Sequence, residues 1–328
     1  MSTVFVTGGT GLTGSNVIKL LLQRGDDVRA LVRSTADAGP LAALGAQLCT
    51  GDITDPDDVK AAASGCEAAI HCAALLGGAS QDLADFHAVN VVGTTNVFDA
   101  ASSHGMRRVV ALSTSTFFDS TVGLALEDAP IAQHPSDDPY TVTKLAAFRE
   151  AVARAAAGQD IVTCHPGAIY GPGPVASRAL ARTSFNRVLL AALRKKLSRY
   201  LWFPVTWVFG EDVASGSIAA LDRGVAGERY MLDGRPEDVM SIAACCNRIC
   251  DIAGVDHHVE DLDASSDPVA LEAEFGPTLV AIATKARANP AERPLDSRTA
   301  LRLGYSPLAL DEGLADLATW LRDLGRFA

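Results

Sequence analysis

Short runs of β-branched and apolar residues alternate with helical segments from the first residues to about residue 165, and this rhythm constrains the fold more than any other feature. STVFVT, VRALVR and EAAIHCA are typical of strands, while LTGSNVIKLLLQRG and DPDDVKAAASG are typical of helices. Strands separated by one helix each run parallel, because parallel neighbours need a crossover connection. Several of these runs are apolar on both faces, as in strands that helices cover on both sides. The chain is therefore predicted to be an α/β protein with a doubly wound parallel sheet.

The pattern changes after GPGPV at 171–175, where a second region begins. Before it, we expect helices at 82–104 and 139–157 and strands at 108–112 and 160–164. After it, residues 176–200 are predicted to be helical and carry seven cations with no acid. An aromatic strand-like run at 201–209, a strand at 228–232, a helix at 241–253 and an amphipathic C-terminal segment follow.

Three glycines lie at the junction of the first strand and the first helix. Gly8, Gly11 and Gly14 are spaced by three residues in TGGTGLTG. Glycine there lets the backbone approach a pyrophosphate, whose charge the amides and dipole of the helix N-terminus stabilise. This context predicts a dinucleotide site and hence a Rossmann fold. We expect the dinucleotide-binding domain to cover 1–172, rejoined by about 207–233, and a smaller, mainly substrate-binding lobe to cover 173–328.

The second strand ends in VRALVRS, without the acid that would accept a bond from the ribose 2′-hydroxyl of NAD. Arg33 instead offers a planar cation suited to a 2′-phosphate, so NADP(H) is favoured over NAD(H). The alternative is that Arg33 is an ordinary surface arginine at a strand end. Further along, Asp52 and Ile53 follow the third strand, where Asp52 is expected to face the adenine. Ala73 and Ala74 end the fourth strand and are small enough for a cofactor to lie close.

Tyr140 and Lys144 form the most specific pattern, YTVTK, in a predicted helix. Residues four apart lie on one helix face. An ammonium about 4 Å from a phenol contributes on the order of 4 kcal/mol at an effective dielectric constant near 20, which lowers the pKa of a tyrosine from about 10 toward neutrality. Tyr140 is therefore a candidate acid/base, against the simpler interpretation of an exposed helix pair.

The chain at this point resembles the extended short-chain dehydrogenase/reductases, also called the NAD-dependent epimerase/dehydratase family, over nearly its whole length. Within that family it looks most like the dihydroflavonol-reductase-type carbonyl reductases. Besides the glycine and tyrosine motifs, the resemblance rests on GDITDPDDV, HCAA, NVVGTTNVFDAA, RVVALSTS, HPGAIYGPG, GEDVA and LDSRTALRLGYSP.

The resemblance implies a role for individual residues. Thr114 takes the position that hydrogen-bonds the reacting oxygen, Tyr140 that of the acid/base, and Lys144 that of the residue holding the nicotinamide ribose. Asn90 falls beside the active site, and Pro166 and Ile169 fall on the segment lining the nicotinamide. The expected cofactor-binding residues are Gly8, Thr10, Gly11, Leu12, Thr13, Gly14, Arg33, Asp52, Ile53, Ala73, Ala74, Tyr140, Lys144, Pro166 and Ile169.

Two positions depart from the family pattern. His165 stands where relatives usually have arginine before Pro-Gly, so no role is carried over to that side chain. Ser115 and Thr116 stand where sugar-nucleotide dehydratases have an Asp-Glu pair, and neither can abstract a carbon-bound proton. Dehydration is therefore not expected, whereas reduction and epimerisation both stay open.

We expect an NADP-dependent oxidoreductase that interconverts a carbonyl and an alcohol on a small, fairly apolar molecule. The apolar character rests on Leu75, Leu76, Phe117, Phe118 and the run at 200–209, each of which core packing explains equally well. A nucleotide-sugar epimerase is the alternative, with the cations of 178–199 holding a diphosphate or simply lying in solvent. A non-catalytic cofactor-sensing protein is a third hypothesis, against which the Tyr-Lys pair argues.

Composition excludes other classes of protein. With 28 basic and 39 acidic residues the net charge is −11, which disfavours nucleic acid as a partner. LWFPVTWVF is about half the roughly 20 residues that a membrane span needs. The start lacks the pattern of a signal peptide, and the seven cysteines contain no C-x-x-C, so we expect a cytoplasmic protein without a metal site. The family resemblance adds a possible homodimer, formed through the helices that carry Asn96 and Lys144.

Overall fold

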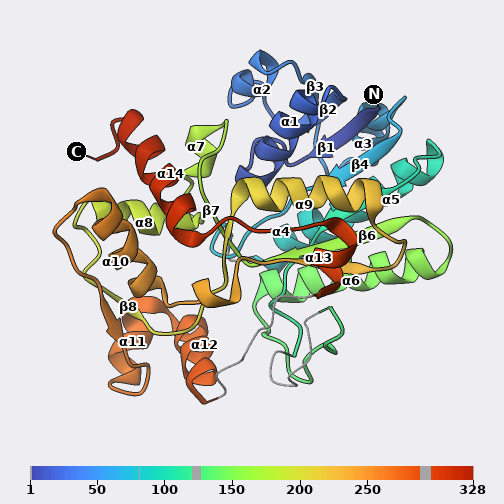
Figure 1. Ribbon diagram of the computed structural model, residues 1–328. Helices are drawn as coiled ribbons and strands as arrows, with labels where there is room; N and C mark the ends of the chain where they lie inside the picture. Colours follow the sequence, from blue (N-terminus) through green and yellow to red (C-terminus); the bar gives the residue numbers. More distant parts are fainter. Residues whose placement is uncertain (1, 81, 120–126, 289–296, 328) are drawn as a thin grey trace.

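A seven-stranded parallel sheet with the order β10-β6-β5-β4-β1-β2-β3 forms the centre of the molecule. The computed structural model describes residues 2–80, 82–119, 127–288 and 297–327 (Figure 1). Every neighbouring pair in this sheet is parallel, which confirms the predicted α/β class and doubly wound Rossmann fold. Its strands are β1 (Thr3–Thr7), β2 (Asp27–Val32), β3 (Gln47–Thr50), β4 (Ala68–His71), β5 (Val109–Leu112), β6 (Ile161–Pro166) and β10 (Arg229–Leu232).

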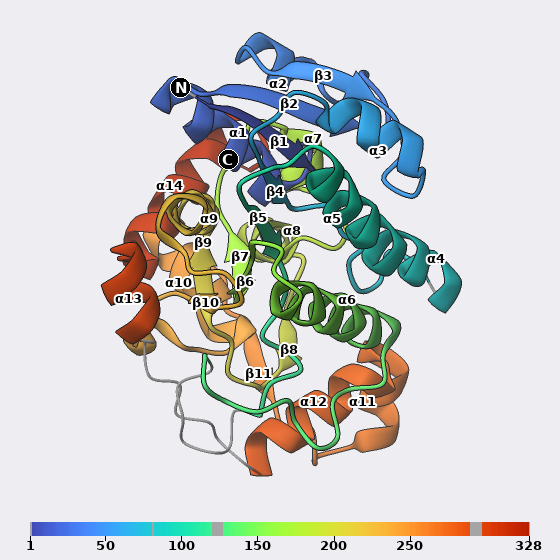
Figure 2. The ribbon, with the colours of Figure 1, turned by 90° about the vertical axis from the view of Figure 1, so that its right-hand side faces the viewer.

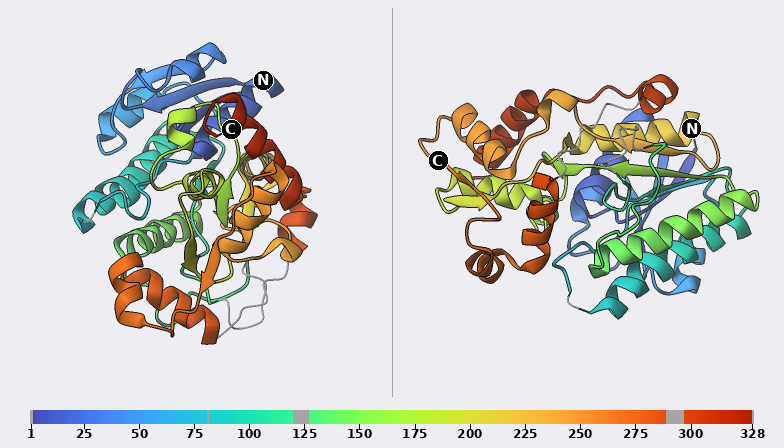
Figure 3. Two further views of the ribbon diagram at one scale, coloured as in Figure 1. Left: turned by 90° about the vertical axis from the view of Figure 1, so that its left-hand side faces the viewer. Right: turned by 90° about the horizontal axis from the view of Figure 1, so that it is seen from below.

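Helices cover both faces of the sheet. Helices α1 and α9 pack on one face, and α3, α5 and α6 pack on the other (Figures 2 and 3). The helices that connect or cover these strands are α1 (Leu12–Arg24), α2 (Gly39–Ala43), α3 (Pro56–Ala63), α4 (Leu83–His87), the π-helical turn η1 (Ala88–Val92), α5 (Gly93–Ser103), α6 (Pro139–Ala156) and α9 (Gly210–Arg223).

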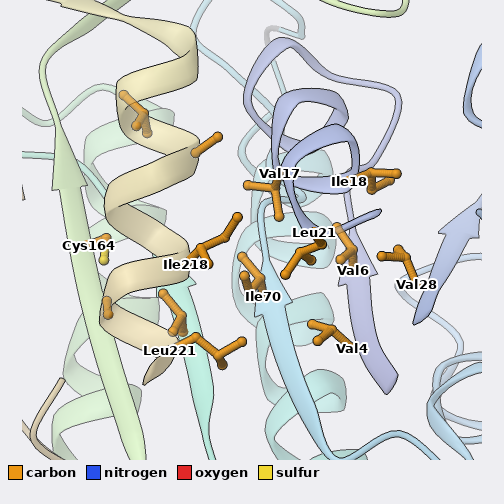
Figure 4. Close-up of a cluster of buried hydrophobic side chains, with 14 of the residues drawn as sticks. Val4, Val6, Val17, Ile18, Leu21, Val28, Ile70, Cys164, Ile218 and Leu221 are labelled. Atoms are coloured by element: carbon orange, nitrogen blue, oxygen red, sulfur yellow. The ribbon is translucent and has the colours of Figure 1, made fainter. Parts of the chain in front are cut away.

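The alternation of side chains along β1 explains why both faces are apolar. Val4 and Val6 pack against α1 and α9, in the cluster that Figure 4 shows, while Phe5 packs with α3 and α5 on the opposite face. All three side chains are completely buried. Burying a side chain of this size contributes about 1.5 to 3 kcal/mol, so an apolar strand is stable only between two helix layers.

Most of the remaining elements gather beside the sheet around a second core, in which Leu190, Cys245 and Leu314 are buried. Residues 268–288 pack in a separate cluster around Leu201, and residues 297–303 pack on α9. Of the segment 207–233, β10 lies in the large sheet, whereas β9 pairs with β7 outside it. These elements are β7 (Ala168–Tyr170), α7 (Ala176–Ala179), α8 (Phe185–Leu193), β8 (Arg199–Leu201), β9 (Trp207–Phe209), the 3₁₀ turn η2 (Pro236–Asp238), α10 (Ile242–Ala253), β11 (Glu260–Leu262), α11 (Pro268–Phe275), α12 (Pro277–Ala288), α13 (Ser297–Leu303) and α14 (Leu310–Asp323).

The prediction of continuous helix over 176–200 is wrong. Helix α7 ends after four residues, α8 begins anew where the Ser184 hydroxyl accepts a hydrogen bond from the Asn186 amide, and Lys195 has a φ of 57°. A left-handed residue ends a helix, so β8 follows. Along the described residues no helix is long and apolar enough to cross a membrane.

Candidate active site

The predicted site residues follow the carboxyl ends of neighbouring strands. Thr7, the last residue of β1, pairs with Leu31 of β2 and with His71, the last residue of β4. Strand order reverses between β1 and β4, and ligands of such sheets bind in the crevice at that switch point. The glycine turn, Arg33, Asp52, the two alanines, Thr114 and Pro166 therefore share one edge of the sheet.

At Gly8 and Gly14, the turn between β1 and α1 has no room for a Cβ atom. Gly8 has a φ of 68°, and a Cβ there would lie 2.5 Å from the amide nitrogen of Ala73. A Cβ on Gly14 would lie 2.3 Å from the carbonyl oxygen of Gly8, which accepts a hydrogen bond from the Gly11 amide at 2.9 Å. No side chain caps α1 at Gly11. The first amides of α1, beside partly exposed Thr10, Leu12 and Thr13, therefore fit a dinucleotide pyrophosphate.

Beyond the glycine turn, β2 is followed by an exposed arginine, and β3 is followed by an aspartate and a buried isoleucine. Arg33 is exposed after β2. Hydrogen bonds from Thr54 lower the pKa of Asp52, and the charge of Arg33 adds a smaller contribution in the same direction. One carboxylate oxygen of Asp52 accepts bonds from the Thr54 amide at 2.9 Å and hydroxyl at 2.8 Å. Ile53 is buried, and its carbonyl accepts a bond from the Asn96 side chain at 2.9 Å. Ile53 thus fixes α5 with its backbone, while Arg33 stays available to a ligand.

Tyr140, Thr114 and Lys144 come together at the start of α6. Asp138 caps this helix by accepting a bond from the Thr141 amide at 2.9 Å, which fixes Tyr140 in the first turn. Burial raises the pKa of Tyr140, and a hydrogen bond with the Thr114 side chain opposes that shift. The Lys144 ammonium donates to the carbonyl oxygen of Leu112 at 2.7 Å, and burial lowers its pKa to about 8.

The expected effect of Lys144 on Tyr140 is not what the structure shows. The pKa of Tyr140 lies above its ordinary value, because the cost of burying a phenolate exceeds the opposing contribution of Thr114. The charge of Lys144 does not reverse this rise in the pKa of Tyr140, because the ammonium donates its hydrogen bond to the carbonyl oxygen of Leu112 at the end of β5. At neutral pH the phenol is therefore protonated and can donate a proton.

Asn90 lies in the π-helical turn that interrupts the predicted helix at 82–104. Its carboxamide is buried, accepts a bond from the Leu75 amide at 2.7 Å and donates to the Leu75 carbonyl at 3.1 Å. The same amide nitrogen donates to the Thr143 hydroxyl at 3.1 Å. Asn90 thus connects the loop after β4 to the helix that carries Tyr140, and a π-turn is often found at such sites.

Sequence reasoning missed a buried histidine beneath these residues. His71 lies between the hydroxyl of Thr7, at 2.7 Å from Nδ1, and that of Thr94, at 2.9 Å from Nε2. Thr94 in turn donates to the carbonyl oxygen of Asn90 at 2.6 Å. Burial lowers the pKa of His71 to about 3, so the ring is neutral. A lone histidine at the end of an apolar strand was the available signal, and it does not reveal its partners.

The aromatic residues expected around the substrate divide into core and surface. Phe117 and Phe118 are 0% and 5% exposed and pack with Phe148, so they form core rather than a binding wall. Trp207 is likewise buried in the second core. Leu76 is 44% exposed and Leu75 partly exposed, at the strand ends beside the alanines. Pro166 is buried at the end of β6, and Ile169 is partly buried in β7.

The cations of 178–199 bond in different directions. Arg178 forms an ion pair with Asp37 at 3.3 Å, and Arg199 forms one with Glu274 at 2.7 Å. Arg182 and Arg194 donate at 2.5 Å to the carbonyl oxygens of Gly78 and Arg326. These four side chains do not converge on one anion. In the described part of the chain, no group of three histidine, cysteine or acidic side chains is placed to hold a metal ion.

Comparison with known sequences identifies the family. The sequence model of the NAD dependent epimerase/dehydratase family matches residues 4–232, from β1 to β10. The chain belongs to this family. The NAD-dependent epimerase/dehydratase family comprises extended short-chain dehydrogenase/reductases that bind NAD(H) or NADP(H), and the prediction of an NAD(P)-dependent enzyme is confirmed.

Curated relatives in the family include several reductases. Sterol demethylase protein B of Methylococcus capsulatus is 27% identical over 334 residues, 98% of this chain and 99% of that protein. The 4-hydroxy-2-methyl-3-oxo-4-farnesyl-3,4-dihydroquinoline-1-oxide ketoreductase of Stigmatella aurantiaca is 33% identical over 245 residues, 72% of this chain and 70% of that protein. A dihydroflavonol 4-reductase-like protein of Synechocystis sp. is 31% identical over 240 residues, 70% of this chain and 66% of that protein.

Solved structures share the whole fold. The crystal structure of gox2253 superposes with a TM-score of 0.84 at 27% identity, covering all of both chains. A UDP-glucose 4-epimerase of Thermotoga maritima, solved with UDP-glucose, has a TM-score of 0.78 at 17% identity and covers 98% of this chain and 99% of its own. The second likeness concerns the fold alone.

Proposed function

We propose that this enzyme is an NADP-dependent oxidoreductase that interconverts a carbonyl and an alcohol on a small, fairly apolar molecule. The observation that carries the proposal is the placement of Tyr140 and Lys144 one turn apart on α6, with the Thr114 side chain close enough to Tyr140 to oppose the rise of its pKa on burial. The nicotinamide cofactor supplies the hydride when bound. Tyr140 donates its proton to the carbonyl oxygen, Thr114 orients that oxygen, and Lys144 holds the cofactor ribose.

Two further observations support reduction. The raised pKa of Tyr140 keeps a proton on the phenol, as a donor to a carbonyl requires. Relatives include proteins named as a ketoreductase and as dihydroflavonol 4-reductase-like. The test is a screen of apolar ketones and aldehydes for NADPH oxidation, in which at least one is expected to be reduced. Failure across the panel would contradict the proposal.

NADP preference is proposed from Arg33, which is exposed at the strand end where a dinucleotide ribose is expected. Charge-assisted hydrogen bonds contribute roughly 1.5 to 3 kcal/mol, or about 10- to 150-fold in affinity. NADPH should therefore bind at least about tenfold tighter than NADH in a fluorescence titration, and Arg33→Asp should reverse the order. Arg29→Gln, four residues earlier and within β2, is the matched control and should leave the ratio unchanged. Equal binding of the two cofactors by the wild-type protein would contradict the preference.

A nucleotide-sugar epimerase is the competing proposal, favoured by the fold of epimerase structures. The diverging partners of Arg178, Arg182 and Arg199 argue against a diphosphate site among them. UDP-glucose should therefore leave the melting temperature unchanged, because only a ligand of the folded state raises it. A salt-sensitive rise with several nucleotide sugars would favour the epimerase, while NADPH binding without any turnover would favour a cofactor-sensing protein.

We also propose the domain boundaries, the oligomeric state and the cellular location of the protein. The dinucleotide-binding domain covers 1–172 with 207–233, and 173–328 otherwise form the substrate-binding lobe. Val142 and Val152 on α6 are 42% and 47% exposed, which supports a homodimer through the layer of α5 and α6. Sedimentation equilibrium tests that dimer. The seven free cysteines suit a reducing compartment, so the cytoplasm is the proposed location, testable by fractionation.

A further inference from the structure

His165 lies where the pairing between β5 and β6 ends. Leu112 of β5 pairs with Cys164 of β6, and the Ser113 amide donates to the Cys164 carbonyl at 2.7 Å. One residue beyond Ser113, the carbonyl oxygen of Thr114 is 2.8 Å from Nδ1 of the His165 ring. The imidazole therefore adds one more bond after the last backbone bond of the ladder.

The partners of the ring fix its tautomer. A carbonyl oxygen only accepts, so the proton lies on Nδ1 and is donated to Thr114. Nε2 must then accept, and the Thr163 hydroxyl lies 3.0 Å from it. The side chain is completely buried, and burial lowers its pKa to about 3, in agreement with a neutral ring that has one donor and one acceptor.

The same ring packs against both elements of the active site. Its edge-to-face neighbours include Phe118, at 5.0 Å between centroids, in the turn after Thr114. Phe148, at 5.3 Å, lies on α6 two turns after Tyr140. His165 thus contacts the loop that carries Thr114 and the helix that carries Tyr140.

Within its own turn, the Thr114 side chain makes long contacts. Its hydroxyl lies 3.4 Å from both the amide and the hydroxyl of Thr116, which is long for a hydrogen bond. The bond from His165 therefore holds the Thr114 carbonyl directly, next to the backbone bond of Ser113, and with it the hydroxyl beside Tyr140.

We propose that His165 is a positioning residue for Thr114, acting through the Nδ1–H bond to the Thr114 carbonyl. The inference rests on the proposed function for its kinetic effect, since Thr114 is assigned there to the reacting oxygen. A side chain that merely filled the core would not need a donor at Nδ1.

Two amide variants of His165 distinguish a residue that positions Thr114 from one that only fills space in the core. The amide nitrogen of His165→Asn takes about the place of Nδ1, whereas that of His165→Gln takes about the place of Nε2. We expect the Asn variant to keep kcat within about threefold, and the Gln variant to lose roughly 10- to 100-fold in kcat, as for a displacement of about 1 Å. Cofactor Kd should stay unchanged in both. Equal kcat for the two variants, or loss of cofactor binding in step with kcat, would overturn the proposal.

A double-mutant cycle shows whether the effect passes through Thr114. In a Thr114→Ala background, His165→Gln should lower kcat by less than about twofold, because coupled residues do not act additively. A further loss as large as in the wild-type background would contradict the mechanism.

The tautomer can be read without any turnover. ¹⁵N NMR of the His165 ring at pH 7 should show Nδ1 protonated and Nε2 unprotonated, and an Nε2–H ring or an imidazolium would overturn the inference. If no carbonyl compound is reduced even by the wild-type enzyme, the proposed function fails, and this measurement still decides the bond to Thr114.

Discussion

Burial acts in opposite directions on the two ionisable residues of α6. It raises the pKa of Tyr140 and lowers that of Lys144 to about 8, because it disfavours the charged form of each. Around pH 7 the phenol therefore keeps its proton and most of the lysine is charged. This combination suits donation of a proton from Tyr140 to a carbonyl oxygen.

Replacing Tyr140 by phenylalanine removes that proton and little else. We predict that kcat falls by roughly 10² to 10⁴, the usual contribution of general acid catalysis, while NADPH affinity changes little. Steady-state kinetics and a fluorescence titration measure the two effects. Tyr230→Phe, whose phenol donates to Glu228 at the amino end of β10, is the matched control. A Tyr140→Phe enzyme with more than half the wild-type kcat contradicts the assignment, provided that chemistry limits turnover.

At the scale of elements, the packing of β1 against α1 leaves no room for a side chain at Gly14. A Cβ on Gly14 would lie 2.3 Å from the Gly8 carbonyl oxygen, so helix and strand must separate in Gly14→Ala. We predict a loss of about 1 to 3 kcal/mol in unfolding free energy, typical of overpacking, together with weaker cofactor binding. Urea denaturation and NADPH titration measure both.

Gly39 provides the control for that substitution. It also begins a helix, but a Cβ there meets nothing within 4 Å. Gly39→Ala should therefore change the unfolding free energy by no more than about 0.5 kcal/mol. Equal unfolding free energies of Gly14→Ala and Gly39→Ala would mean that α1 can move away from β1 without a loss of stability.

Sequence patterns predicted the elements that local signals determine. The helix predicted at 139–157 is α6, and the strand predicted at 228–232 is β10, because apolar periodicity and a Pro at the helix start mark them. The break at 180–184 and the π-turn around Asn90 were not predicted from the sequence. Alanine, leucine and arginine favour helix whether or not tertiary contacts interrupt it. The candidate site was predicted by strand ends and motifs, whereas the roles of His71 and His165 depend on distant partners that no local pattern contains.

At the scale of the whole molecule, two buried neutral histidines couple stability to pH. His71 and His165 have a pKa of about 3 in the folded protein and about 6.5 when unfolded. Between those values the unfolded chain binds more protons, so stability falls as pH falls from 6.5 toward 3. Each histidine should lower the unfolding free energy by about 2 kcal/mol between pH 7 and pH 5.

A histidine variant isolates that contribution from the carboxylates. His165→Asn should lose about 2 kcal/mol less than the wild-type protein between pH 7 and pH 5 in urea denaturation. The same fall in both proteins would mean that His165 is protonated or exposed in the folded state.

The parallel sheet brings a glycine turn, an arginine and a Thr-Tyr-Lys group to one edge, and the proposed function places hydride and proton transfer to one carbonyl there. The most direct test is the fate of the hydride. NADPH deuterated at the transferred position of C4 is incubated with an apolar ketone that the screen has identified, and the product is analysed by mass spectrometry. We predict one deuterium on the carbinol carbon for each NADPH oxidised, with the rate reduced in Tyr140→Phe. Product without deuterium, or an NADPH that stays unoxidised while UDP-glucose is epimerised, would contradict carbonyl reduction.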